Sequence, residues 1–374
     1  MKIAIIHEWL DSYAGSERVL EQLLACFPEA DLYALCDFLP ENQRGFLGGK
    51  IPTTSFIQRL PLARRMFRNY LQLMPLAVEQ FDLQGYDMVL SSSHAVAKGV
   101  ITGPGTRHVS YVHSPMRYAW DLQHQYLRQA GLTRGLKGLY TRWLLGRMRA
   151  WDQMSAARPD VILGNSRYIV ERIRKVWRRE ASVLHPPVDL AGFPLGSGPR
   201  GHFLVASRQV PYKRIELVAE AFARMPELKL TIVGDGPAAP LVAAAAAGAP
   251  NITIRGRVPQ PELVSLLQTA RAFVFAAEED FGIAMVEAQS CGTPLIVYDR
   301  GGARDIVDEG RTGLFFDAQT PDAIIAAVRR FVAHEADFTP QACAAQAQQF
   351  SIAEFRRKLM EIVAAPSGAS GLAP

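Results

Sequence analysis

Two acidic side chains flank a glycine in the stretch from Glu278 to Glu287, which follows a short apolar run and opens a helical pattern. Gly282 lets the backbone approach a ligand closely, and the N–H groups of a helix's first turn favour an anion such as phosphate. Glu279 and Glu287 can accept hydrogen bonds from hydroxyl groups on two parts of one ligand, such as a sugar and a ribose. The alternative is a helix-start acid at Glu279 and a solvent-exposed helical acid at Glu287.

A second loop carries two cations directly after an apolar run at residues 203–206. Arg208 offers a planar fork to phosphate oxygens and Lys213 offers a point charge, so this loop suits a nucleotide diphosphate. The alternative is two surface cations at the start of a helix, where the helix dipole disfavours positive charge. That mismatch favours a binding role.

Two further loops lie in the first half of the chain. Gly15 and Ser16 precede a helical pattern, which suits close approach of a diphosphate but also fits an ordinary turn and N-cap. His113 ends an apolar run, where an imidazole can hydrogen bond a sugar or help to manage a proton. A structural histidine beside a surface pair of Arg117 and Asp121 is an equally open interpretation.

The elements that position these loops are short apolar strands alternating with helices, a pattern typical of parallel α/β sheets. A length of 374 residues suits two domains. The Pro- and Gly-rich stretch at residues 186–199 separates two such series. We therefore expect Rossmann-like domains over residues 1–190 and 191–350, which bind ligands beyond the carboxyl ends of their strands. A capping box at Ser351 predicts a last helix over residues 351–364, followed by a flexible tail over residues 365–374.

Motif absences and composition restrict the function classes. The chain has no G-x-x-x-x-G-K-[ST], H-E-x-x-H, G-x-S-x-G or D-x-D sequence, which argues against P-loop enzymes, zincins, serine hydrolases and metal-chelating transferases. No stretch reaches the ~18 apolar residues of a spanning helix. The four cysteines form no C-x-x-C pair and are expected to be small buried residues in a reducing cytosol.

Positive charge is concentrated in the first half of the chain. Residues 1–180 hold 24 Lys and Arg against 16 Asp and Glu, and residues 128–179 hold 13 against three. A basic face of this kind suggests a polyanion or an anionic membrane surface, although a solvated helical face is the alternative.

Together the loops resemble the family 4 retaining glycosyltransferases of the GT-B fold. The resemblance rests on the glutamate pair separated by seven residues, the S-R-x-x-x-x-K loop, the G-D-G-P turn at residues 234–237 and the first glycine loop. It runs from Met1 to about Val363. Residues 113–121, 165–168 and 186–189 resemble the subgroup of bacterial O-antigen and exopolysaccharide mannosyltransferases. The resemblance implies an α/β fold of two Rossmann-like domains facing across a cleft, with a C-terminal helix crossing back to the first domain.

The resemblance also implies a role for each matching position. Arg208 and Lys213 hold the donor diphosphate, and Glu287 accepts hydrogen bonds from the ribose. Glu279 and His113 are implied to bind the sugar in the catalytic centre. Backbone N–H groups are implied to donate to sugar or phosphate oxygens, and these belong to Gly15, Ser16, Phe281, Gly282 and Ile283. The family often has two adjacent glycines in the first loop, and Ala14 replaces one of them here, which a negative φ tolerates.

The implied reaction is a metal-independent hexosyl transfer with retention, with no cofactor and with GDP-mannose as the favoured donor. The leaving phosphate oxygen takes the acceptor's proton. The acceptor is a polyprenyl-diphosphate-linked glycan or a polysaccharide in bacterial surface glycan synthesis. This acceptor implies a cytoplasmic protein that is peripheral on the inner face of the cytoplasmic membrane and has no nucleic acid partner.

Basic residues interleaved with apolar ones suggest how such a protein attaches to anionic lipid. These residues are Arg59, Arg64, Arg65, Arg68, Arg134, Lys137, Arg142, Arg147 and Arg149. Two other interpretations stay open. One is a nucleotide-sugar 2-epimerase, which also uses two Rossmann-like halves, and the other is a non-enzymatic polyanion-binding protein.

Overall fold

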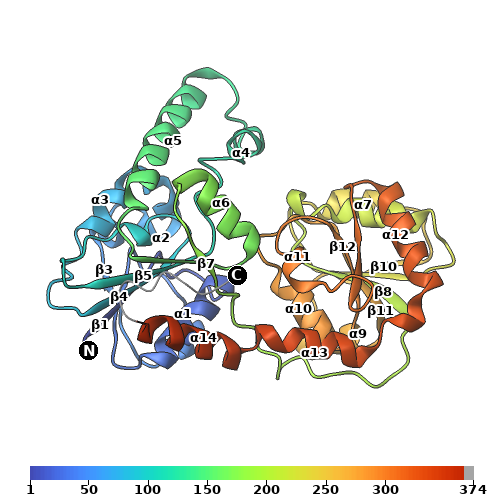
Figure 1. Cartoon of the computed structure of the whole chain (residues 1–374). Coiled ribbons are helices and arrows are strands. Elements are labelled where there is room, and N and C mark those ends of the chain that lie inside the picture. Colours follow the sequence, from blue (N-terminus) through green and yellow to red (C-terminus); the bar gives the residue numbers. More distant parts are fainter. Residues whose placement is uncertain (366–374) are drawn as a thin grey trace. The chain divides into compact units, whose positions relative to one another are not determined.

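The computed structural model describes residues 1–365 and divides them into two compact units (Figure 1). Unit 1 comprises residues 1–186 together with the last described residues from 355 onward, and unit 2 comprises residues 187–354. The expected tail lies outside the described residues, apart from residue 365.

Unit 1 is built on a parallel sheet in the order β3-β2-β1-β4-β5-β6-β7. Its strands are β1 (Ile3–His7), β2 (Asp31–Ala34), β3 (Thr53–Thr54), β4 (Met88–Ser93), β5 (Arg107–Val112), β6 (Val161–Gly164) and β7 (Ser182–Val183). The strand order reverses between β1 and β4, which makes their carboxyl ends a topological switch point where ligands of such sheets bind. The short strand β2 was not predicted, although Leu32, Tyr33 and Ala34 follow Asp31 as a short apolar run.

The helices of unit 1 pack on the faces of this sheet. The α-helices are α1 (Gly15–Cys26), α2 (Ala63–Met66), α3 (Met74–Glu79), α4 (Gln123–Gln129), α5 (Gly135–Ser155) and α6 (Arg167–Trp177). The 3-10 turns are η1 (Glu41–Gln43), η2 (Gly45–Leu47), η3 (Phe56–Arg59), η4 (Phe67–Leu73) and η5 (Ala97–Gly99). Val19, Leu20 and Leu23 of α1 lie in one core with strand residues such as Ile5, as the amphipathic spacing of this segment requires.

Unit 2 repeats the arrangement with a parallel sheet in the order β10-β9-β8-β11-β12-β13. Its strands are β8 (His202–Ala206), β9 (Leu230–Val233), β10 (Ile252–Ile254), β11 (Ala270–Phe275), β12 (Leu295–Tyr298) and β13 (Gly313–Phe316). The order now reverses between β8 and β11. Their carboxyl ends therefore form the switch point of this sheet.

The helices of unit 2 cover both faces of its sheet. They are α7 (Ile215–Ala223), α8 (Ala239–Ala245), α9 (Gln260–Gln268), α10 (Ile283–Ser290), α11 (Ala303–Ile306), α12 (Pro321–Ala333) and α13 (Pro340–Ala347), with 3-10 turns η6 (Pro211–Lys213), η7 (Glu335–Asp337) and η8 (Gln348–Phe350). Fully buried Phe203, Phe222 and Phe331 pack together beneath α7 and α12. The alternation of strands and helices confirms the predicted α/β class in both units.

The last helix, α14 (Ile352–Ala364), returns to unit 1 as predicted. Its start is capped by Ser351, whose Oγ accepts from the backbone N–H of Glu354 at 3.3 Å. Phe355 and Leu359 are buried in the same core as α1 and β1. At the other end, the Arg107 guanidinium of β5 donates to the carbonyls of residues 362, 363 and 365, which have no partner inside the helix.

Unit 1 buries charge deeply. The Lys98 ammonium, fully excluded from solvent, lies 2.6 Å from Asp152 of α5 and 3.0 Å from the Ser155 hydroxyl. The other carboxylate oxygen of Asp152 accepts from the indoles of Trp120 and Trp177, both at 2.7 Å. Each charged atom therefore has partners, which a buried ion pair requires to be tolerated.

Candidate functional site

The two loops that carry the strongest sequence signals lie side by side at the switch point of unit 2. Strands β8 and β11 are parallel neighbours, with Leu204 opposite Phe273. Because parallel strands end at the same edge of a sheet, the loop that follows β8 meets the loop that follows β11. The predicted cations and the predicted glutamates are thereby brought together.

An ion pair joins these loops directly. The Lys213 ammonium contacts the Glu279 carboxylate, and both side chains keep a small exposed fraction of 14% and 18%. The ammonium also lies 5.0 Å from the centre of the Phe275 ring. Arg208 lies on the same loop and is exposed. A partly exposed cation of this kind retains donors for a bound anion, since an ammonium carries three.

The N-terminus of α10 forms the second wall of this site. Gly282 caps the helix with φ of +109°, and a Cβ at this position would collide with the Met285 side chain. Phe281 is buried and packs edge-on against Phe350, with the ring centres 5.4 Å apart, so its side chain anchors the turn. The N–H groups of Ile283 and Ala284 have no earlier turn to donate to and favour an anion, whereas the Met285 N–H donates to the Gly282 carbonyl at 3.0 Å.

Gly302 also contacts this turn, and no role was predicted for it from the sequence. Its N–H donates to the Glu279 carbonyl at 2.8 Å. A Cβ on Gly302 would collide with the Phe281 backbone. The adjacent glycines at 301 and 302 were a visible signal, but the sequence did not say which loop they approach.

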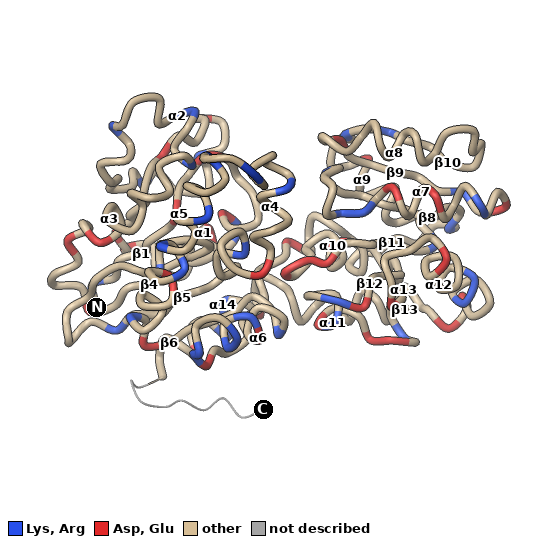
Figure 2. The backbone as a smooth tube through the Cα atoms, turned by 90° about the horizontal axis from the view of Figure 1, so that it is seen from above, with Lys and Arg blue, Asp and Glu red and all other residues tan. Residues whose placement is uncertain are grey.

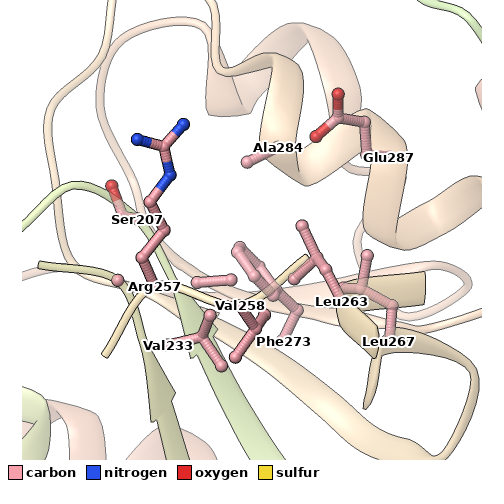
Figure 3. A pocket seen from close by; sticks show the side chains of 11 residues that line it. Ser207, Val233, Arg257, Val258, Leu263, Leu267, Phe273, Ala284 and Glu287 are labelled. Carbon is pink, nitrogen blue, oxygen red and sulfur yellow. The ribbon is translucent and has the colours of Figure 1, made fainter. Parts of the chain in front are cut away.

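Glu287 lines a cavity of about 240 Å³ beside these loops (Figure 3). Its side chain is 9% exposed, so it is not the solvent-exposed helical acid of the alternative interpretation. Arg257, which was not predicted, lies on the opposite side of the cavity. The floor between them is apolar and consists of Val233, Val258, Leu263, Leu267 and Phe273. Such a cavity suits a flat, largely apolar group with polar atoms at its edge.

The predicted G-D-G-P turn is tied to the cationic loop. Gln209 donates from its backbone to Asp235 at 2.9 Å and from its side chain to the carbonyl of Gly234 at 2.7 Å. Gln209 is nearly fully buried. This unpredicted glutamine therefore fixes the loop on which Arg208 lies.

In unit 1, the glycine loop begins α1 at the β1/β4 switch point. Ala14 is the N-cap with φ of −141°, the negative value that tolerates its methyl group. Glu17 reaches back and accepts from the Ala14 N–H at 2.9 Å and the Ser16 hydroxyl at 3.0 Å. A glutamate three residues after the N-cap is a known helix-start signal, so the sequence could have identified Glu17.

His113 lies at the carboxyl end of β5 and is held from several sides. Its Nε2 is 2.9 Å from the Ser92 hydroxyl, and its carbonyl accepts from the Asn165 side chain at 2.9 Å. Burial lowers the pKa of His113 well below its usual value of 6.5, and His94 and His7 add to this effect. Asp121 accepts from Arg172 of α6 at 2.9 Å, so it is not simply half of a surface pair with Arg117.

No group of three or more His, Cys, Asp and Glu side chains within residues 1–365 is arranged to hold a metal ion. Over the same residues, no helix combines the length and the apolarity needed to cross a bilayer. The Lys213–Glu279 contact, the start of α10 and the cavity lined by Glu287 support anion and hydroxyl binding by cations, carboxylates and backbone N–H groups.

Two parallel-sheet units with these loops at their switch points define the class of GT-B glycosyltransferases. The families described as "Glycosyltransferase Family 4" and "Glycosyl transferases group 1" match residues 13–191 and 197–350 respectively. The chain belongs to these glycosyltransferases.

Curated relatives match over part of their length. The GDP-mannose-dependent alpha-(1-6)-phosphatidylinositol monomannoside mannosyltransferase of Mycolicibacterium smegmatis is 29% identical over 198 residues, which cover 45% of this chain and 52% of the relative. The D-rhamnosyltransferase WbpZ of Pseudomonas aeruginosa is 29% identical over 220 residues, covering 54% and 55%. The matches therefore span about half the length of these two relatives.

Solved structures share the fold over nearly the whole chain. Sucrose-phosphate synthase from Thermosynechococcus elongatus matches with a TM-score of 0.72 at 17% identity. The match covers 97% of this chain and 98% of the synthase chain. Anabaena HepE in complex with UDP has a TM-score of 0.67 at 14% identity, covering 97% and 99%. These likenesses confirm the predicted fold.

Proposed function

We propose that the protein transfers a hexose, with mannose from GDP-mannose as the favoured case, to a lipid-linked or polysaccharide acceptor with retention of configuration. The observation that carries this proposal is the Lys213–Glu279 contact at the switch point of unit 2, beside the N-terminus of α10. A cation and a carboxylate at one edge suit a ligand that has both an anionic group and hydroxyl groups.

The contacts of unit 2 suggest how the donor lies. The diphosphate binds Arg208, Lys213 and the N–H groups after Gly282. The nucleoside enters the neighbouring cavity, where Glu287 accepts hydrogen bonds from the ribose hydroxyls and the base lies on the apolar floor. Glu279 accepts from a hydroxyl of the transferred sugar. The family resemblance assigns backbone N–H contacts with the diphosphate to Gly15 and Ser16 and a sugar contact to His113, and the proposal keeps these assignments.

The same contacts suggest how the transfer proceeds. The bond between the anomeric carbon and the diphosphate oxygen breaks, the acceptor oxygen forms the new bond, and its proton passes to the leaving phosphate oxygen. Arg208, Lys213 and the α10 terminus stabilise the negative charge that develops on the diphosphate. No side-chain nucleophile is needed, so Glu279 orients the sugar. No cofactor or metal enters these steps.

The choice of donor is tested by a thermal-shift titration with GDP, UDP and ADP, each with and without EDTA. Selective stabilisation by GDP that EDTA leaves unchanged supports the proposal. Stabilisation by UDP alone would keep the transferase and overturn GDP-mannose. No shift with any nucleotide would favour the polyanion-binding interpretation. Incubation with GDP-mannose and no acceptor then separates a transferase from an epimerase, since only an epimerase forms a second nucleotide sugar.

We further propose that α5 of unit 1 docks on an anionic membrane surface, where a polyprenyl-linked acceptor resides. Four apolar side chains are 51% to 85% exposed at a spacing that puts them on one helix face: Leu136, Leu139, Tyr140 and Trp143. The Tyr140 and Trp143 rings stack at 5.8 Å. Arg134 and Lys137 lie beside this face in the sequence, and the Arg147 guanidinium lies 5.4 Å from the centre of the Trp143 ring. Figure 2 shows Lys and Arg positions in blue along the tube beside the α5 label. Exposed apolar and basic side chains together are typical of interfacial helices.

Three of the nine basic residues expected to meet lipid have hydrogen-bond or ion-pair partners within unit 1. Arg68 pairs with Asp11 at 2.6 Å, Arg142 donates to the Thr133 carbonyl at 2.7 Å, and Arg149 donates to the Ala119 carbonyl at 2.7 Å. The docking surface proposed here is therefore the exposed face of α5 with its flanking cations.

Vesicle flotation tests the docking surface. We expect binding to vesicles of mixed anionic and neutral lipid at low salt, weaker binding at high salt, and loss of binding in Leu139→Glu. Leu241→Glu is the matched control, because Leu241 is an equally apolar exposed residue on α8 of unit 2. Equal flotation of both variants and the unmodified protein would overturn the proposal.

A further inference from the structure

Four buried or half-buried polar side chains form one continuous chain in unit 1. Glu17 lies 3.2 Å from Nε2 of His7, Nδ1 of His7 lies 3.2 Å from the Ser92 hydroxyl, and that hydroxyl lies 2.9 Å from Nε2 of His113. His7 and Ser92 are fully excluded from solvent, and Glu17 is 3% exposed. The chain thus connects the start of α1 with the candidate sugar-contacting histidine.

The proton positions in this series of hydrogen-bonded side chains depend on one another. Glu17 also accepts from Ala14 and Ser16, so its ionised carboxylate requires a proton on Nε2 of His7. The Ser92 hydroxyl has only one proton, which it can donate to one imidazole while it accepts from the other. The direction of the Ser92 hydrogen bond therefore links the proton positions on the two histidines.

With a neutral His113, two arrangements of protons satisfy both contacts of the Ser92 hydroxyl. When His7 is neutral, Ser92 donates to its Nδ1 and accepts from Nε2–H of His113, whose Nδ1 is then bare. When His7 is protonated, its Nδ1–H donates to Ser92, Ser92 donates to Nε2 of His113, and His113 carries its proton on Nδ1. That Nδ1 has no hydrogen-bond partner among residues 1–365, so it is open to an outside group.

We propose that Glu17, His7 and Ser92 form a proton relay that lets His113 take up a proton at Nδ1 while the positive charge passes to His7. In this step a proton enters at Nδ1 of His113, the Nε2 proton moves to the Ser92 oxygen, and the Ser92 proton moves to Nδ1 of His7. His113 ends neutral and His7 ends as a cation beside the Glu17 carboxylate. The balance is one proton gained, with no other reactant.

The surroundings explain why the relay is needed. His113 itself resists protonation because it is buried and faces His94. Burial would raise the pKa of Glu17, yet its hydrogen bond and attraction to His7 lower that pKa to about 2. The other charged groups nearby are Glu8, which is hydrogen bonded to backbone N–H groups at residues 94–97, and Arg68, which acts on His94. Glu17 is thus the carboxylate in direct contact with the relay.

Nitrogen-15 NMR of histidine-labelled protein tests the relay without any assay. Chemical shifts of the ring nitrogens report which of them carries a proton, and His113→Gln and His7→Gln assign the signals. At every pH from 5 to 8 we expect one of two combinations. In the first, His7 is neutral and Nδ1 of His113 carries no proton. In the second, His7 is protonated and Nδ1 of His113 carries a proton. Neutral His7 together with a protonated Nδ1 on His113 would overturn the relay.

Ser92→Ala cuts the relay, and Ser91→Ala is its matched control. Ser91 is the preceding residue of β4, is equally buried, and bonds another histidine, His108, at 2.8 Å. We expect Ser92→Ala to abolish the correlation between the two histidines and Ser91→Ala to preserve it. Loss of the correlation in both variants would show a general disturbance of the strand and overturn the relay.

The consequence for catalysis rests on the proposed function. With GDP-mannose as the probe, we expect Ser92→Ala to lower kcat about fivefold to tenfold with little change in KM, the size of one lost hydrogen bond, and Ser91→Ala to stay within about twofold. If the unmodified protein does not turn over GDP-mannose, the proposed donor fails while the NMR result on the relay stands. Equal kcat values for both variants would overturn the catalytic role of the relay.

Discussion

Unit 1 and unit 2 place chemistry-bearing side chains at equivalent switch points, but they expose them differently. At the β1/β4 end of unit 1, His7 and Ser92 have no exposed surface and are linked by hydrogen bonds. At the β8/β11 end of unit 2, Lys213 and Glu279 keep 14% and 18% of their side chains exposed, and Arg208 is exposed beside them. In unit 1, burial leaves the polar side chains only each other as hydrogen-bond partners, so the positions of their protons are linked. In unit 2, partial exposure leaves the cations available to an anion.

The largest expected effect tests the buried charge of unit 1. Asp152→Ala leaves the Lys98 ammonium without its carboxylate and two indoles without an acceptor. We expect a loss of about 3–5 kcal/mol in the free energy of unfolding. All five tryptophans lie in residues 9–177, so urea unfolding followed by tryptophan fluorescence reports on unit 1. Glu180→Ala, which breaks an exposed ion pair with Arg174, is the control and should leave the midpoint unchanged.

The second effect tests the exposed cations of unit 2. Lys213→Ala removes a charge that would stabilise the leaving diphosphate, so we expect kcat for transfer from GDP-mannose to fall about 10²-fold to 10³-fold. The melting temperature should change little, because the side chain is not part of a core. Arg224→Ala removes a more exposed cation at the other end of α7 and should leave the rate unchanged. An unchanged rate in Lys213→Ala would contradict the assignment of this loop.

A third prediction concerns the pH dependence of stability in unit 1. The pKa of Glu17 in the folded protein is about 2, below its usual value near 4.5. A lowered pKa means that its stabilising contribution is complete above about pH 4.5 and is lost as the pH falls towards 2. We expect the unfolding free energies of the unmodified protein and Glu17→Gln to differ by about 3 kcal/mol at pH 7.

This difference should shrink steadily in urea titrations at pH 5, 4 and 3. Comparing the two proteins removes the contributions of Glu8 and of the buried histidines, which both proteins share. A difference that is independent of pH would contradict the ionised Glu17–His7 contact.

The smallest effect concerns the cavity of unit 2. Glu287→Gln keeps the size of the side chain and removes its charge, so the ribose hydroxyls lose a charged acceptor. We expect nucleotide affinity to fall about tenfold, near the value of one hydrogen bond to a charged group. Isothermal titration with GDP measures this change. An equal loss in Glu262→Gln, a partly exposed acid on α9 that pairs with Arg255, would point to a general electrostatic effect instead.

The sequence predicted unit 2 better than unit 1, for a physical reason. The Arg208–Lys213 and Glu279–Glu287 motifs are local, and the strands before them are continuous apolar runs, so parallel-sheet geometry alone brings the two loops together. The relay of unit 1 joins residues 7, 17, 92 and 113, whose pairing depends on the strand order. Local spacing carries no information on that order. Lys98 and Asp152 were hidden in the same way, since each looks like a surface residue until the fold places them together.

The return of α14 has a consequence for the order of synthesis. Unit 2 has all of its residues once the ribosome has passed residue 354, but unit 1 then still lacks the helix that fills its core with Phe355 and Leu359. Arg107 is translated about 250 residues earlier, and its guanidinium has these acceptors only after residues 362, 363 and 365 have been added. The domain that is translated first is therefore completed after unit 2, and the nascent chain keeps this gap in its core until the residues of α14 have been added.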